Sequence, residues 1–158
     1  MGVSGCGKTT IGQQLAKLFD WAFIEGDNFH PKENIQKMAD GIPLTDSDRQ
    51  PWLETLHNQL ITYQKDGRSA ILACSALKKK YRQALRGNLK RVNFVYLKGD
   101  FDMIQNRMRE RAHFMKADML KSQFYTLEEP IDAFAVDISE SAEVIVQKIA
   151  AKYKGATC

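Results

Sequence analysis

A glycine-rich loop near Met1 is the part of the sequence whose residue types most directly imply chemistry. The loop matches the pattern GxxxxGK[ST] and consists of Gly2, Val3, Ser4, Gly5, Cys6, Gly7, Lys8 and Thr9. Glycines let main-chain N–H groups approach a polyphosphate closely. Lys8 can then reach the β- and γ-phosphates, and the Thr9 hydroxyl is suited to bind Mg²⁺. The pattern therefore predicts that residues 2–10, Thr10 included, bind ATP together with Mg²⁺. The alternative is a glycine-rich turn without a ligand.

Two further side chains have the chemistry of an acceptor site. Asp27 follows a short apolar run, and a carboxylate there can take the proton of an attacking hydroxyl and orient it. The alternative for Asp27 is a turn or helix-capping residue. Arg49 offers a bidentate guanidinium for a substrate carboxylate. Its alternative is a surface ion pair with Asp46 or Asp48.

Basic residues are concentrated in two later stretches. Lys78 follows an apolar run and could bind the acceptor, whereas the rest of the basic run 78–91, Arg82 included, is typical of a solvated helix face. Arg107 and Arg111 are four residues apart and share a helix face. We predict that both arginines act in catalysis from a lid at about 107–125. A salt-bridged, exposed helix is the alternative.

The elements that must position these residues are visible in the alternation of short apolar runs and amphipathic stretches. Strands are predicted near 22–24, 69–74, 92–97 and 134–138, and helices after Lys8, just after Pro51, and over 78–86, 101–111 and 145–153. This order predicts an α/β fold in one domain, residues 1–158. It would have three layers, with helices on both faces of a parallel sheet and a helical lid. Ligands of such sheets bind beyond the carboxyl ends of the strands.

One element of this fold is absent from the sequence. A phosphate loop normally lies between a strand and a helix, but here Met1 directly precedes the loop. That first strand usually lies in the middle of the sheet, so we expect a gap there. One interpretation is that the sequence begins at an internal methionine.

Composition narrows the class of protein. The chain has 158 residues, a net charge of +4 and three scattered cysteines. This charge suits anionic small molecules and is lower than that typical of a dedicated nucleic-acid binder. Apolar runs are too short to span a bilayer, and no secretory signal is visible. We predict a cytoplasmic protein with free thiols, without nucleic-acid or membrane partners.

Longer blocks carry a family resemblance. GDNFHP at 26–31, PLTDSDRQPWL at 43–53 and CSALKKKYR at 74–82 occur in the order and spacing of the gluconokinase family, and the resemblance extends to about Ile138. It implies a nucleoside-monophosphate-kinase-like fold, Mg-ATP as phosphate donor and D-gluconate as acceptor. It also implies substrate-binding roles for His30 and Gln123 beside Asp27, Arg49 and Lys78, with 6-phosphogluconate as product and a possible homodimer.

Besides the absent strand, two departures from the family pattern stand out, and some alternatives stay open. Glu25 stands where many relatives carry Asp, and the stretch 111–113 looks shorter than the usual arginine-x-glycine-histidine. A kinase for another hydroxy acid, such as shikimate, is one alternative, and a non-catalytic nucleotide-binding remnant is another. A GTP-dependent switch is disfavoured because no NKxD motif is present.

Overall fold

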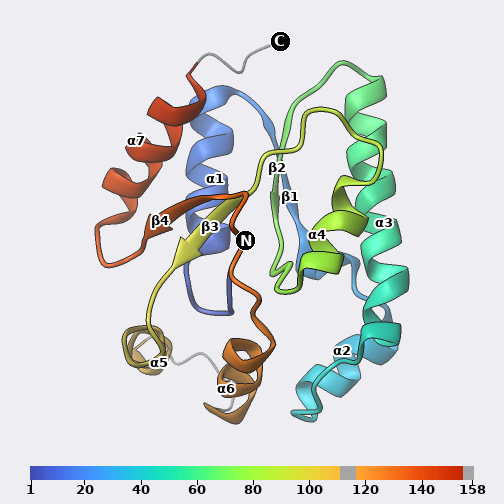
Figure 1. The fold of residues 1–158 in the computed structure, drawn as a ribbon, viewed down its shortest axis with the longest axis vertical. Helices are drawn as coiled ribbons and strands as arrows, with labels where there is room; N and C mark the ends of the chain where they lie inside the picture. Colours follow the sequence, from blue (N-terminus) through green and yellow to red (C-terminus); the bar gives the residue numbers. More distant parts are fainter. Residues whose placement is uncertain (111–116, 155–158) are drawn as a thin grey trace.

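The computed structural model describes residues 1–110 and 117–154, and Figure 1 shows their arrangement. In chain order the elements are α1 (Lys8–Phe19), β1 (Ala22–Glu25), a 3-10 turn (Gly26–Phe29), α2 (Lys32–Ala39), α3 (Asp46–Lys65), β2 (Ala70–Ala73), α4 (Lys79–Arg86), β3 (Val95–Lys98), α5 (Phe101–Glu110), α6 (Ala117–Thr126), β4 (Phe134–Asp137) and α7 (Ala142–Tyr153). The predicted α/β class is confirmed: every strand pairing is parallel, and helices pack on the strands.

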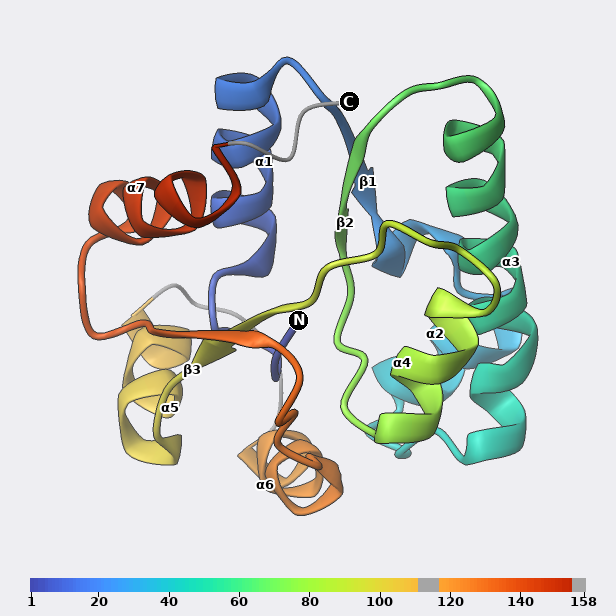
Figure 2. The ribbon, with the colours of Figure 1, turned by 45° about the horizontal axis from the view of Figure 1, so that its top comes forward.

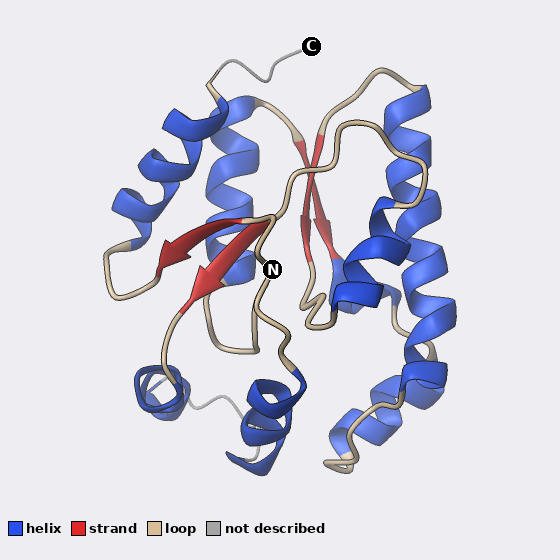
Figure 3. Ribbon diagram, in the orientation of Figure 1, coloured by secondary structure: helices blue, strands red, loops and turns tan. Residues whose placement is uncertain are grey.

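The sheet consists of two separate halves. β1 pairs with β2 and β3 pairs with β4, and no ladder joins the two pairs in the described residues. Figure 3 shows the two pairs of strands with the N-terminus between them. The Met1 nitrogen donates to Val95 O at 2.6 Å, Leu97 N donates to Met1 O at 3.0 Å, and Gly2 N donates to Ser75 O at 3.2 Å. The expected gap is therefore present between β2 and β3, and Met1 lies at its lower end.

Helices cover both faces of the split sheet, as predicted for a three-layer fold. Figure 2 shows α1 and α7 on one side and α3 and α4 on the other. The core follows this division. Fully buried Ile104 and Ile138 belong to the cluster that joins α1, α5 and α7 to β3 and β4. Trp52 and Leu56 belong to a second cluster, formed between α3 and α4.

The start of α3 differs from the sequence expectation. The helix begins at Asp46 rather than after Pro51, because Thr45 and Asp48 form a capping box. Asp48 N donates to the Thr45 hydroxyl, and Thr45 N donates to the Asp48 carboxylate at 2.8 Å. This reciprocal cap satisfies helix-end N–H groups. It lets the helix extend ahead of the proline, whose missing N–H costs a single backbone hydrogen bond.

Two helices, α2 and α6, were not predicted as elements. α5 and α6 lie below the carboxyl end of β3, next to the phosphate loop (Figures 1 and 2), and the end of α5 and most of α6 fall within 107–125, the range for which a lid stays a prediction. Arg111 lies outside the described residues. Within the described ranges, none of the helices combines the length and apolar character that a membrane crossing requires.

Candidate active site

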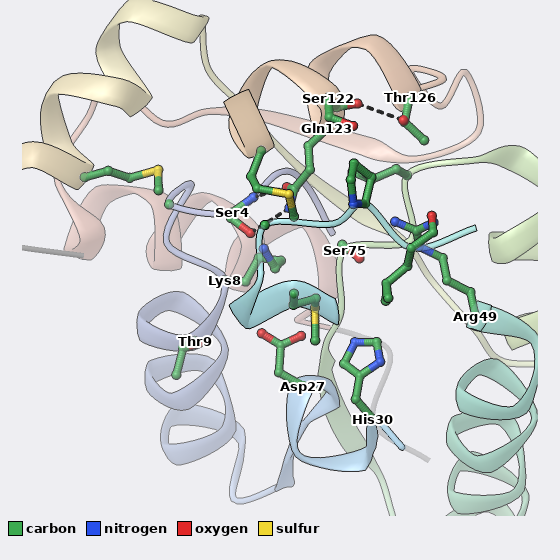
Figure 4. A pocket seen from close by; sticks show the side chains of 18 of the residues that line it. Ser4, Lys8, Thr9, Asp27, His30, Arg49, Ser75, Ser122, Gln123 and Thr126 are labelled. Carbon is green, nitrogen blue, oxygen red and sulfur yellow. Dashed lines mark hydrogen bonds between the residues drawn. The ribbon is translucent and has the colours of Figure 1, made fainter. Parts of the chain in front are cut away.

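A cavity of about 610 Å³ opens at the carboxyl ends of the strands. It is bounded by the phosphate loop, the turn after β1, the start of α3 and the helices α5 and α6 (Figure 4). Most of the predicted site residues line it, namely Ser4, Gly5, Gly7, Lys8, Thr9, Thr10, Asp27, His30, Arg49, Arg107 and Gln123. The remaining predicted residues among those described do not line it: Gly2, Val3 and Cys6 of the loop are buried, and Lys78 lies outside the lining.

The phosphate loop holds its shape through backbone conformations that favour glycine. Gly5 and Gly7 have φ of 79° and 96°. A Cβ on Gly5 would also lie 2.6 Å from Met108 Cγ, so the loop fits closely against α5. Gly7 caps α1 without a side-chain hydrogen bond. The first N–H groups of α1 therefore point toward the cavity as an anion-binding surface.

Lys8 and Thr9 begin α1 at the mouth of the cavity. The Lys8 ammonium donates to Val3 O at 2.9 Å, which places its charge beside the loop. The Thr9 hydroxyl donates to Glu25 Oε2 at 2.7 Å, so a hydroxyl and a carboxylate oxygen lie together where β1 ends. Such oxygen donors suit Mg²⁺, which is commonly bound through only one or two protein ligands. No cluster of three or more His, Cys, Asp or Glu suited to a metal occurs among the described residues.

The turn after β1 carries Asp27 and is fixed by the strand and helix beside it. A Cβ on Gly26 would lie 2.6 Å from Ala73 O, so this position admits little more than glycine. The Trp52 indole N–H donates to Gly26 O at 2.8 Å. Asp27 is thereby held next to the phosphate loop while remaining exposed to the cavity, as Figure 4 shows.

His30 lies on the same side of the cavity. Its ring stacks on Trp52 with centroids 4.2 Å apart and an interplanar angle of 12°. Burial, together with the nearby Arg49 charge, lowers the pKa of His30 despite the opposing effect of Asp27. Its Nδ1 atom is buried and has no hydrogen-bond partner within the described part of the chain. Burial therefore favours the neutral form of the imidazole.

Arg49 enters the cavity from the first turns of α3. Its guanidinium donates to the main-chain oxygens of Leu44 and Thr45, and it lies 5.5 Å from the centroid of the Tyr81 ring. The two aspartates that offered an alternative ion pair have other partners. Asp48 pairs with Lys37 at 2.7 Å, and no ion pair of Arg49 occurs among the described residues. Its positive charge is thus not neutralised by either carboxylate.

Asp46 forms the centre of a polar cluster at the start of α3. It accepts from Lys78 at 3.0 Å, from Lys80 at 2.6 Å and from the Tyr81 hydroxyl. These hydrogen bonds hold the pKa of Asp46 well below its usual range. Lys78, predicted to bind substrate, is therefore paired with Asp46 beside the cavity.

Arg82, within the same basic run, corrects part of the sequence interpretation. It was predicted on a solvated face, but it is buried. Its guanidinium donates to Ala76 O and Leu77 O at 3.1 and 3.0 Å. It therefore braces the loop after β2 and does not contribute to an exposed basic surface.

Gln123 joins α6 to the phosphate loop. Ser4 N donates to its Oε1 at 2.7 Å, and its Nε2 donates to the Ser4 hydroxyl at 3.0 Å. The side chain was predicted to bind the acceptor, and its contacts place it at the phosphate end. Some lining residues were not assigned from the sequence, among them Trp52, Ser75, Leu77, Met119, Ser122 and Thr126. The family blocks contain Trp52, Ser75 and Leu77, which is the signal that could have identified them.

The comparisons with known proteins agree with this geometry. A family model described as shikimate kinase matches residues 4–154. Thermoresistant gluconokinase of Escherichia coli (strain K12) is 45% identical over 151 residues, covering 92% of this chain and 86% of that protein. Gluconokinase of Gluconobacter oxydans (strain 621H) is 47% identical over 133 residues, covering 84% and 75%.

Solved structures show the same relationship. The crystal structure of a gluconokinase from Sinorhizobium meliloti 1021 superposes with a TM-score of 0.90 at 40% identity, covering 99% of this chain and 90% of that one. An APS kinase from Mycobacterium tuberculosis shares the fold at 14% identity, with a TM-score of 0.74. Fold and site thus define a P-loop kinase. Within that class, the chain belongs to the gluconokinase family.

Proposed function

We propose that this protein transfers the γ-phosphate of ATP to D-gluconate, giving 6-phospho-D-gluconate and ADP. The observation that carries the proposal is that Asp27, His30 and Arg49 line the same cavity as the phosphate loop. The identity to several gluconokinases favours gluconate over shikimate as acceptor.

The phosphate end would bind ATP through the loop N–H groups and Lys8. Lys8 neutralises charge that develops on the transferred group, which is the main requirement of phosphoryl transfer. Thr9, with Glu25 behind it, would hold Mg²⁺, and the bound ion would neutralise charge between the β- and γ-phosphates. The Thr9–Glu25 hydrogen bond of 2.7 Å fixes the hydroxyl for this role. Glu25 thus supplies a carboxylate at the position where many relatives carry Asp.

The acceptor end would bind gluconate by its carboxylate and hydroxyls. Neither Asp46 nor Asp48 neutralises Arg49, and its planar guanidinium can donate two parallel hydrogen bonds to the gluconate carboxylate. The imidazole of His30, which lines the cavity, would form a hydrogen bond with a sugar hydroxyl. Asp27 would accept the proton of the attacking hydroxyl and aim it at the γ-phosphate. Lys78 would act from outside the lining, through Asp46 and Tyr81, whose ring lies under Arg49.

α5 and α6 would serve as the lid. Arg107 lines the cavity from α5, and closure would bring it onto the phosphates. Arg111, outside the described residues, would act on the same charge. Gln123 already joins the lid to Ser4. Lid closure would exclude water while the transfer occurs. Homodimer assembly and a cytoplasmic location stay predictions.

A coupled ADP-release assay tests the proposed activity. The full chain would be assayed with Mg-ATP against D-gluconate, a panel of epimeric sugar acids and shikimate. We expect turnover with gluconate at the highest kcat/KM, and none when Mg²⁺ is chelated. Turnover with shikimate but not gluconate would move the assignment to the alternative acceptor. Lack of turnover with every sugar acid would overturn it.

A further inference from the structure

The chain between β2 and α4, residues 75–78, is held by one buried arginine. The Arg82 guanidinium donates to Ala76 O at 3.1 Å and to Leu77 O at 3.0 Å. Arg82 is 5% exposed, and none of the ion pairs between described residues includes it. Burying a cation costs free energy unless hydrogen bonds or an opposite charge compensate it. The bonds to this segment, called the 75–78 loop below, therefore compensate the buried charge.

Ala76 has a backbone conformation that an alanine rarely adopts. Its φ is 45°, in the left-handed region that favours glycine, and the residue is fully buried. A non-glycine residue persists in such a conformation where the surrounding contacts determine it. The bonds from Arg82 to the oxygen of Ala76 and to that of the next residue are such contacts. Arg82 thus stabilises a strained turn between Ser75 and Leu77, which both line the active-site cavity.

Main-chain hydrogen bonds fix the two sides of this turn as well. Ser75 O accepts from Gly2 N at 3.2 Å, and Leu77 O accepts a second hydrogen bond, from Glu128 N, at 2.9 Å. The first bond joins the turn to the phosphate loop, and the second joins it to the segment after α6. Each main-chain oxygen of residues 75–77 thus has a donor within the protein.

The Ser75 hydroxyl, by contrast, is available to a ligand. It forms no hydrogen bond with the described part of the chain, and Figure 4 shows Ser75 among the side chains that line the cavity. Glu25 pairs with Ala73 in the β1–β2 ladder, and Asp27 and Ser75 each follow two residues later. The hydroxyl is therefore placed on the strand next to the one that carries the proposed base. A free hydroxyl there can donate to one ligand oxygen and accept from another.

We propose that Arg82 is a positioning residue for the acceptor. It holds Ala76 in its left-handed conformation and so keeps the Ser75 hydroxyl at the acceptor end, where this hydroxyl bonds a hydroxyl of the substrate. Arg82 does not line the cavity, so it acts through the 75–78 loop. A fixed hydroxyl beside Asp27 favours one arrangement of substrate hydroxyls over its epimers. The inference rests on the proposed sugar-acid kinase activity.

Substitutions on α4 of the full chain test this role. Arg82→Met keeps much of the side-chain volume and removes the donors, whereas Arg82→Lys keeps the charge without the planar guanidinium. In ADP-release assays, KM for gluconate should rise by ~5–10-fold in Arg82→Met and by less in Arg82→Lys, while KM for ATP stays nearly unchanged. Arg86→Met, which removes a half-exposed arginine of the same helix, is the matched control and should match the wild type. Equal KM values for gluconate in Arg82→Met and Arg86→Met would overturn the proposal.

A double-mutant cycle with Ser75→Ala separates positioning from a general loss of stability. Ser75→Ala alone should raise KM for gluconate by ~5–10-fold. Arg82→Met should add little in that background, because the group that Arg82 positions is already absent. Independent, multiplying effects of the two substitutions would overturn the proposal, and so would an unchanged KM for gluconate in Ser75→Ala.

Crystal structures give a readout that does not depend on turnover. Compared with the wild type, ligand-free Arg82→Met should show Ala76 outside the positive-φ region and the Ser75 hydroxyl displaced by at least ~1 Å, a shift large enough to impair a reaction. Arg82→Lys is crystallised alongside as the milder change. An unchanged 75–78 loop in both variants would overturn the proposal. Lack of wild-type turnover with every sugar acid would instead overturn the proposed function, and the structural comparison would still decide whether Arg82 shapes the loop.

Discussion

The phosphate end of the cavity is one continuous segment, residues 4–10, whereas the acceptor end is gathered from distant parts of the chain. Asp27 and His30 come from the turn after β1, Arg49 from α3 and Ser75 from the end of β2. The phosphate end acts largely through main-chain N–H groups and a helix terminus. The acceptor end acts through side chains that Trp52 and Tyr81 hold in place.

This difference separates binding from selectivity. A backbone cradle recognises any polyphosphate and depends on glycines and one lysine. Side chains set by stacking and capping can distinguish one sugar acid from another, because unpaired polar groups penalise a poor substrate. Substitutions at the two ends should therefore change different kinetic constants.

The largest effect is expected at Lys8. Lys8→Ala removes the cation that neutralises the transferred phosphate, so kcat/KM should fall by ~10³-fold or more. The assay is ADP release at saturating gluconate. Lys17→Ala, in the last turn of the same helix, is the matched control and should retain full activity. Comparable turnover in both variants would remove Lys8 from the mechanism.

Asp27→Asn is expected to have the next largest effect, and it separates catalysis from ATP binding. Loss of the base should lower kcat by ~10²–10⁴-fold, while ATP binding measured by calorimetry stays nearly unchanged. Asp20→Asn, an exposed carboxylate in a left-handed conformation that Asn tolerates, is the control. A normal kcat in the Asp27 variant would show that another group accepts the proton.

Substitutions of two basic side chains, Arg49 and Lys78, test the acceptor end. Arg49→Lys loses the bidentate fork, so KM for gluconate should rise by ~10–100-fold with little change in KM for ATP. Lys78→Met should raise KM for gluconate less, since Lys78 lies outside the lining and pairs with Asp46. The reverse order of the two effects would place the carboxylate beside Lys78.

Substitution of Gln123 tests whether α6 contributes to the phosphate end or to the acceptor end of the cavity. Because its amide bonds Ser4 of the phosphate loop through both its oxygen and its nitrogen, Gln123→Ala should change KM for ATP by roughly 3–10-fold and KM for gluconate less. Gln147→Ala on α7 is an exposed control. A selective change in KM for gluconate would restore the acceptor role that the sequence predicted.

The smallest effect concerns pH. The pKa of His30 is lowered from 6.5 by burial, so the unfolded chain binds this proton more readily than the folded protein. This contribution to stability is fully present above 6.5 and is lost as pH falls toward the folded pKa. His30→Gln should flatten the decrease in unfolding free energy below 6.5, measured by urea titration. Parallel pH profiles for the two proteins would contradict the buried, neutral imidazole.

The sequence predicted contiguous features better than assembled ones. The loop pattern predicted the helix that begins at Lys8, and the alternation of apolar runs predicted the order of the strands. The predicted start of α3 was wrong. Pro51 indicated a first-turn position, but the Thr45–Asp48 cap lets the helix begin at Asp46. The Asp46 cluster and the buried Arg82 arise from contacts between separate helices and loops, which spacing along the chain does not encode.

The most direct measurement is a crystal structure with Mg²⁺, a non-hydrolysable ATP analogue and D-gluconate. It should show a gluconate hydroxyl within about 3 Å of the Asp27 carboxylate and in line with the terminal phosphate, with the gluconate carboxylate on Arg49. Gluconate bound away from Asp27, with the analogue seated in the phosphate loop, would contradict this mechanism.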